Sequence, residues 1–85
     1  MLGHVMINSR LQRLITQRNI ARLQSGQKAM SMRQLAEESN IPASVLDGLA
    51  RNRVKRMDFK TLERLCYFFG CTPGDILEYI PPDNS

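Results

Sequence analysis

The sequence predicts an all-α fold, a compact domain of five short helices. Apolar residues recur with helical spacing along most of the chain, and residues typical of helix ends separate these segments. The 85 residues suffice for one small domain. We place this domain at residues 1–80, followed by a frayed tail at 81–85. Apolar or extended stretches at Val5–Ile7 and Glu78–Ile80 leave room for two short terminal strands.

The first helix is expected to begin after Asn8 or Ser9, since either side chain can cap a helix. One face of this helix is apolar: Leu11, Leu14 and Ile15. Further along, the same face carries Arg18 and Arg22. The helix therefore either extends past the core or breaks near Asn19, and the sequence leaves both readings open.

Two further helices are predicted on either side of a turn at Asn40. Ser31 can cap the first of them, and Gln34 three residues later completes a capping box. Asn40 tolerates the positive φ that a sharp turn requires. Pro42 suits the first turn of the next helix, where a missing N–H costs nothing. The residues expected to face the core are Leu35, Ala36, Ile41, Leu46 and Leu49.

The last two helices have clear boundary signals. Asp58 can cap the fourth helix, and Gly70 can end it. Thr72 and Pro73 then restart the chain as cap and first helical residue, and Asp75 complements the helix dipole. The residues that keep helical spacing in the fourth helix are Phe59, Leu62, Leu65 and Phe69.

The spacing between Leu35 and Leu49 is the most informative pattern in the chain. A small residue at Ala36 allows two helices to approach closely, and Asn40 redirects the backbone four residues later. Ile41 and the leucines beyond it would hold the pair at a steep angle. A helix-turn-helix, here residues 32–51, has these mechanical requirements. An ordinary helical hairpin within a core is the alternative interpretation.

Charge is distributed unevenly along the chain. Residues 1–74 contain all twelve Lys and Arg and five acidic residues, for a net charge of +7, whereas residues 75–85 carry −3. The loop at 51–56, Arg-Asn-Arg-Val-Lys-Arg, is strongly basic and follows the third helix directly. A basic body favours a polyanionic partner such as double-stranded DNA. A solvated surface that serves only solubility remains the alternative.

Other classes of protein find little support in the sequence. No apolar stretch approaches the length of a membrane span, and the N-terminus lacks the pattern of a secretion signal, so we expect a cytoplasmic protein without a membrane partner. Cys66 and Cys71 are interpreted as reduced thiols rather than as metal ligands, because His4 is the only histidine. No catalytic arrangement, phosphate loop or metal cluster is evident, so we expect neither an enzyme nor a cofactor.

Two stretches give the chain a family resemblance: Val54–Cys66 (VKRMDFKTLERLC) and Cys71–Glu78 (CTPGDILE). With them, residues from about Ile7 to Pro81 resemble a Cro/C1-type (XRE-like) helix-turn-helix domain. The resemblance implies a lambda-repressor-like DNA-binding fold of five helices, with Val5–Ile7 paired to Glu78–Ile80. It further implies a sequence-specific transcriptional regulator that acts as a homodimer and is nucleoid-associated when bound to DNA.

The resemblance also assigns roles to particular residues. Those expected to face the bases of the major groove are Ala43, Ser44, Asp47 and Arg51. Those expected to contact the DNA backbone are Ser31, Arg33, Asn52, Arg53 and Lys55. Two positions depart from the family pattern: Met32 stands where Gln is usual, and Gly48 stands where a polar residue often projects. The reading helix is therefore poor in hydrogen-bond donors, and we expect backbone contacts to supply most of the affinity.

This donor-poor helix leaves a second function open. The same fold can act as a protein-interaction module, such as an antitoxin or an anti-repressor-like partner. The aromatic run Tyr67, Phe68 and Phe69 cannot lie entirely on one face of a helix, so Tyr67 or Phe68 is a candidate for an exposed contact. Ile20 and Leu23 on the first helix are candidates for a subunit contact. The two functions are compatible with each other.

Overall fold

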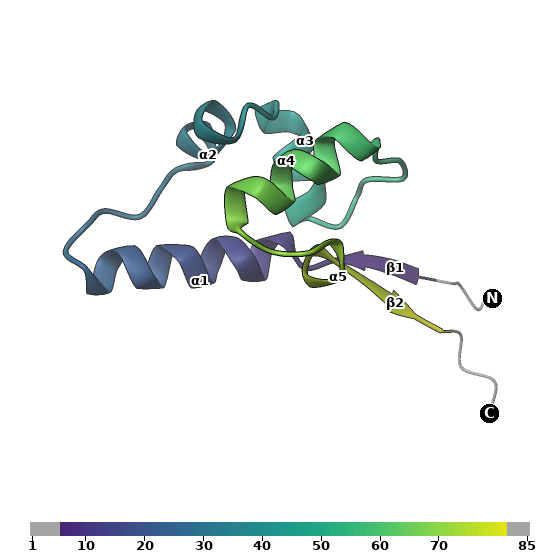
Figure 1. Ribbon diagram of the computed structural model, residues 1–85, viewed down its shortest axis with the longest axis horizontal. Helices are drawn as coiled ribbons and strands as arrows, with labels where there is room; N and C mark the ends of the chain where they lie inside the picture. Colours follow the sequence, from purple (N-terminus) through teal and green to yellow (C-terminus); the bar gives the residue numbers. More distant parts are fainter. Residues whose placement is uncertain (1–5, 82–85) are drawn as a thin grey trace.

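The computed structural model describes residues 6–81, and it contains five helices and two short strands (Figure 1). The elements, in chain order, are β1 (Met6–Ser9), α1 (Leu11–Gln24), α2 (Met32–Ser39), α3 (Ala43–Ala50), α4 (Phe59–Phe69), α5 (Pro73–Ile76) and β2 (Leu77–Ile80). The five predicted helices are confirmed, and the strands are those that the sequence left room for. Among the described residues, no helix is long and apolar enough to cross a membrane.

The strands β1 and β2 form an antiparallel ribbon that joins the two ends of the domain. Ile7 lies opposite Tyr79, and Ser9 lies opposite Leu77. The expected pairing of these segments is confirmed for its described part, whereas Val5 lies outside the described residues. An ion pair of 3.1 Å between Arg10 and Glu78 closes the base of the ribbon. Its hydrogen bond lowers the pKa of the Glu78 carboxyl below the ordinary value.

Helix α1 continues through Asn19 to Gln24, so the structure decides between the two interpretations left open by the sequence. The Asn19 side chain accepts a hydrogen bond from the backbone N–H of Met30 at 2.8 Å and thereby fastens the following loop to the helix. The Arg18 guanidinium lies 4.5 Å from the centre of the Phe68 ring, a cation–π distance. Gly26 has a positive φ of 81° just beyond the helix end.

The caps of the first helix differ from the prediction. The cap position is Arg10, not Asn8 or Ser9. The Ser9 hydroxyl nevertheless accepts a hydrogen bond from the N–H of Leu11 at 3.1 Å. Asn8 belongs to β1, and its side-chain oxygen accepts a hydrogen bond from the side chain of Asn52. Pro42 likewise occupies the cap position of α3, one residue before the expected place.

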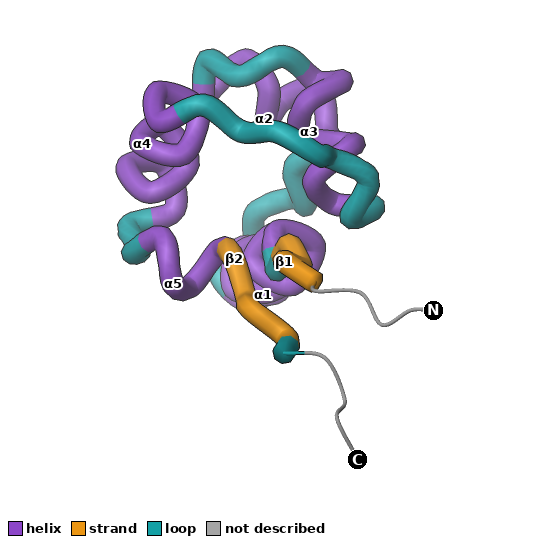
Figure 2. The backbone as a smooth tube through the Cα atoms, turned by 90° about the vertical axis from the view of Figure 1, so that its right-hand side faces the viewer, coloured by secondary structure: helices purple, strands orange, loops and turns teal. Residues whose placement is uncertain are grey.

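The core lies where α1, α2, α3 and α4 meet, on one side of α1 (Figure 2). Its buried apolar side chains are Leu11, Ile15, Met30, Leu35, Ile41, Leu46, Leu49, Leu65 and Ile76. Phe59 was expected on the core face of α4 but is 88% exposed. As the first helical residue after the Asp58 cap, it lies beyond the end of the core. Phe69 is only half-buried against the core.

Candidate nucleic-acid interface

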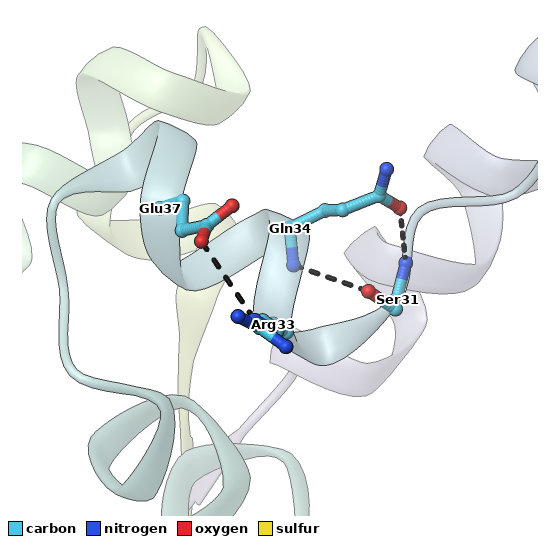
Figure 3. A network of polar contacts seen from close by, with 4 residues as sticks. All are labelled: Ser31, Arg33, Gln34 and Glu37. Carbon is cyan, nitrogen blue, oxygen red and sulfur yellow. Dashed lines mark hydrogen bonds and ion pairs between the residues drawn. The ribbon is translucent and has the colours of Figure 1, made fainter.

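Helix α2 begins with a complete capping box (Figure 3). The Ser31 hydroxyl accepts from the backbone N–H of Gln34 at 3.1 Å, and the Gln34 side chain accepts from the N–H of Ser31 at 2.9 Å. The Ser31 hydroxyl proton remains able to donate, and the backbone N–H groups of Met32 and Arg33 have no acceptor within the helix. This end of α2 therefore offers donors to an anion.

Arg33 extends from the same helix end into solvent. Its Nε lies 3.8 Å from a carboxylate oxygen of Glu37, and both side chains are largely exposed (Figure 3). Exposed ion pairs of this kind stabilise a helix by a few tenths of a kcal/mol at most, roughly 0.3–0.5, so the guanidinium is readily available to another anion. Met32, in contrast, is half-buried and packs against the core.

The turn between α2 and α3 has the geometry that the sequence predicts. Asn40 ends α2 with a φ of 61°, and its carbonyl oxygen accepts a hydrogen bond from the Arg64 side chain at 3.2 Å. Ile41 is buried directly after it. Leu46 and Leu49 are buried on the inner face of α3. Because these contacts anchor one face of α3, the opposite face remains on the surface.

That outer face carries the predicted reading residues at helical spacing. Ala43 and Ser44 are exposed in its first turn, Asp47 is half-buried one turn further, and Arg51 is exposed at the end. The Arg51 Nε lies 3.0 Å from a carboxylate oxygen of Asp47. The structure thus brings the four residues together, and it holds the Arg51 guanidinium along the helix surface.

Gly48 faces the basic loop and not the outer face of α3, where the sequence suggested it. It does not project from the outer face of α3: a Cβ added there would lie 3.0 Å from a methyl carbon of Val54. The backbone N–H of Arg53 donates to the carbonyl oxygen of Gly48 at 2.7 Å. The missing side chain therefore lets the basic loop fold back closely against α3, which is a structural role.

Asn52 ties this loop to the terminal ribbon. Its backbone has a positive φ of 59°. Its side-chain oxygen accepts from the N–H of Ser9 at 2.9 Å, and its side-chain nitrogen donates to the Asn8 side chain at 2.8 Å. Both polar atoms of the amide are thus engaged by β1, more than 40 residues away in sequence. No pattern in the sequence indicated this link.

Apart from Arg51, the cations of the loop have no acidic partner among the described residues. Arg53, Lys55 and Arg56 are all exposed, and no ion pair involves them within residues 6–81. Arg56 was not among the predicted backbone contacts, although it belongs to the same basic loop. The loop therefore presents three uncompensated positive charges beside the C-terminal end of α3. Within the same described residues, no cluster of His, Cys, Asp and Glu could hold a metal ion.

Two helices joined by a left-handed turn, with one polar surface face and cations at its end, define a helix-turn-helix DNA-binding domain. The chain belongs to the Cro/C1-type HTH DNA-binding domain family, whose model matches residues 22–82. A relative from Bacillus subtilis (strain 168), the uncharacterized HTH-type transcriptional regulator YozG, is 38% identical over 58 residues, covering 68% of this chain and 69% of the relative. No solved structure shows significant similarity to the chain.

Proposed function

We propose that this protein is a cytoplasmic transcriptional regulator that binds double-stranded DNA sequence-specifically, with α3 in the major groove. The observation that carries the proposal is the arrangement of α3. Helix α3 lies between α2, whose first turn offers hydrogen-bond donors to phosphate, and the basic loop 51–56 (Figure 1). This arrangement allows backbone contacts on both sides of the groove while the reading face is held against the bases.

Base recognition is assigned to Ser44, Asp47 and Arg51, with Ala43 in contact with a thymine methyl group. Arg51 is the strongest reader because its guanidinium can bond both O6 and N7 of guanine. The Asp47 carboxylate lies 3.0 Å from the Nε of Arg51, so the terminal nitrogens of this guanidinium remain available for the contact with guanine. Asp47 can also accept from a cytosine amino group. One good bidentate contact is worth roughly 1–3 kcal/mol, so discrimination by this face is modest.

Phosphate contacts are assigned to Ser31, Arg33, Arg53 and Lys55. The serine hydroxyl and the α2 N–H groups act as neutral hydrogen-bond donors. The three cations neutralise phosphates and thereby release counterions from the DNA. Asn52 was predicted to make a phosphate contact as well. Because β1 engages both polar atoms of its side chain, we assign it the role of positioning the loop.

The test is fluorescence anisotropy across a salt series with two labelled duplexes. One, the upstream duplex, has the sequence that precedes the protein's own gene, and the other is a scrambled duplex of equal composition. Arg53→Ala should weaken binding to both duplexes equally and reduce the slope of log K against log salt by about 1. Arg51→Ala should lower the preference for the upstream duplex. Arg13→Ala removes the same charge from an exposed position on α1 and is the matched control. No preference between the duplexes at physiological salt would refute sequence-specific regulation.

A homodimer on a near-palindromic operator is part of this proposal, because a two-fold pair of half-sites is the usual arrangement for such domains. The interaction-module alternative stays a prediction. Tyr67, which is 91% exposed on α4, is the side chain that a protein partner would cover. A complex that masks Tyr67 and excludes DNA would favour that alternative.

A further inference from the structure

The ribbon of β1 and β2 has two outer edges, and their backbone groups can be assigned from the register. The N–H of Arg10 donates to the carbonyl oxygen of Ile76 at 2.7 Å, so this pair is hydrogen-bonded across the ribbon. Hydrogen-bonded and non-bonded pairs alternate in an antiparallel ladder. The pairs Ile7 with Tyr79 and Ser9 with Leu77 are therefore non-bonded. Their N–H and C=O groups point outward, away from the partner strand.

The two outer edges differ in what covers them. On β1, the outward N–H of Ser9 is taken by the Asn52 side chain, which lies against this edge. On β2, the N–H of Leu77 donates back to the carbonyl oxygen of Pro73. The outward backbone groups of Ile7 on β1 and of Tyr79 on β2 have no hydrogen-bond partner among residues 6–81. The β1 edge is nevertheless flanked by the basic loop, because Ile7 and Ser9 line one hollow together with Asn52, Lys55 and Arg56. An unprotected strand edge is a template for pairing with another strand, and β2 provides it.

Exposed apolar side chains accompany this edge. Ile7 and Tyr79 lie opposite each other on one face of the ribbon and are 57% and 58% exposed. Ile80 on the other face is 39% exposed. A two-stranded ribbon is marginally stable by itself, and additional strands with an apolar face stabilise it. The ribbon extends away from the helices (Figure 1), so the helices do not obstruct its approach to another ribbon.

We propose that β2 is the homodimer contact: β2 of one copy pairs antiparallel with β2 of a second copy to form a four-stranded sheet. The two-fold axis passes between the two Tyr79 residues, each donating its N–H to the other's C=O. In this register Glu78 lies opposite Ile80. A register centred on Glu78 would instead place two carboxylates directly opposite each other, which is destabilising. The contact itself is argued from the ribbon alone. Only its role, which is to place two copies on two half-sites, rests on the proposed function.

The contact is short, and its length determines how the dimer behaves. Pro81 has no N–H, so the ladder ends one residue beyond Ile80. With one central pair of hydrogen bonds and two apolar side chains per chain, the dimer is weak in solution. Two adjacent half-sites on one duplex raise the effective concentration of the chains to the millimolar range. The dimer therefore forms on DNA, and binding to the two half-sites is cooperative.

Substitution by proline tests the assignment of the edge. Tyr79→Pro removes the outward N–H that the dimer needs and breaks no bond within the ribbon, since proline is tolerated on the outer side of an edge strand. Ile7→Pro removes the equivalent N–H from the β1 edge, which the basic loop flanks, and is the matched control. Tyr79→Pro should weaken binding to the upstream duplex by about 10-fold or more and abolish cooperativity. Its affinity for a duplex truncated to one half-site should match that of the wild type. Retained cooperativity in Tyr79→Pro would overturn the proposal.

Cross-linking tests the same contact without relying on DNA affinity. The Cα atoms of a hydrogen-bonded antiparallel pair are about 5.5 Å apart, within the range of about 4.4–6.8 Å that a disulfide spans. Tyr79→Cys should therefore form a disulfide-linked dimer under mild oxidation, at high protein concentration and more readily with the duplex. Ile7→Cys should not, and the wild type controls for Cys66 and Cys71. Equal cross-linking of both variants would overturn the contact. If wild type binds no duplex, the proposed function fails, whereas the cross-link in free protein still decides the interface.

Discussion

Replacing Asn52 by glycine tests whether the basic loop is held by the ribbon. Glycine adopts the observed φ of 59° without steric strain, so the folded state loses only the side-chain bonds to Ser9 and Asn8. A hydrogen bond contributes about 0.5–1.5 kcal/mol net. These two are exposed, which places their joint loss at about 1–2 kcal/mol. For a domain of this size we expect the melting temperature to fall by about 5–10 °C.

The measurement is thermal and urea unfolding followed by circular dichroism, with Asn40→Gly as the matched control. Asn40 has nearly the same backbone conformation, φ 61°, but no hydrogen bond of its side chain is found within residues 6–81. Asn52→Gly should be the less stable variant, and it should also bind the upstream duplex more weakly because the loop is no longer positioned. If both variants unfold at the same temperature, the link between ribbon and loop contributes nothing, and the reasoning is refuted.

Other changes probe the caps, the core and the carboxylates. Ser31→Ala should lower the free energy of unfolding by about 1 kcal/mol, measured in urea, because the α2 cap is lost; an unchanged midpoint would contradict this. Leu65→Ala empties a fully buried position and should cost about 2–5 kcal/mol. Phe59→Ala removes an exposed ring and should change stability by less than about 0.5 kcal/mol, so equal losses would contradict the observed burial. Hydrogen bonds from threonines hold the pKa of Asp58 and of Asp75 below the ordinary 3.8. The stability that these carboxylates add is thus present above about pH 4 and lost as the pH falls through their folded-state pKa values. The Asp58→Asn, Asp75→Asn double variant should therefore lose less free energy of unfolding than the wild type as the pH falls through this range, as measured by urea unfolding at a series of pH values.

Local signals predicted most of the helical framework. The Ser31 capping box, the left-handed Asn40 and Gly70, and the Asp58 and Thr72 caps all lie where their chemistry indicated. Such features involve residues within one turn of each other, so the sequence contains both partners side by side. Phe59 shows where this reasoning ends. Helical spacing identifies a face, but only the position of the neighbouring helices decides how far the core extends along it.

The candidate interface shows the same division. The family resemblance was sufficient to name four side chains that share one surface of α3. It could not show that Asp47 holds Arg51, or that Gly48 faces Val54 instead of DNA. A glycine in a helix has no side chain to reveal which way it points. Its role therefore became visible only when the loop that packs against it was placed.

By itself, the sequence determined the number of helices, the turn between α2 and α3, and the basic character of the loop that follows. Periodicity, capping and charge are local properties, and each can be read within a few residues. Only the tertiary structure brought Asn52 to Asn8 and Ser9 and left the Tyr79 edge of the ribbon uncovered. These arrangements join segments more than 40 residues apart. Their geometry depends on the packing of the whole chain, which no local pattern encodes.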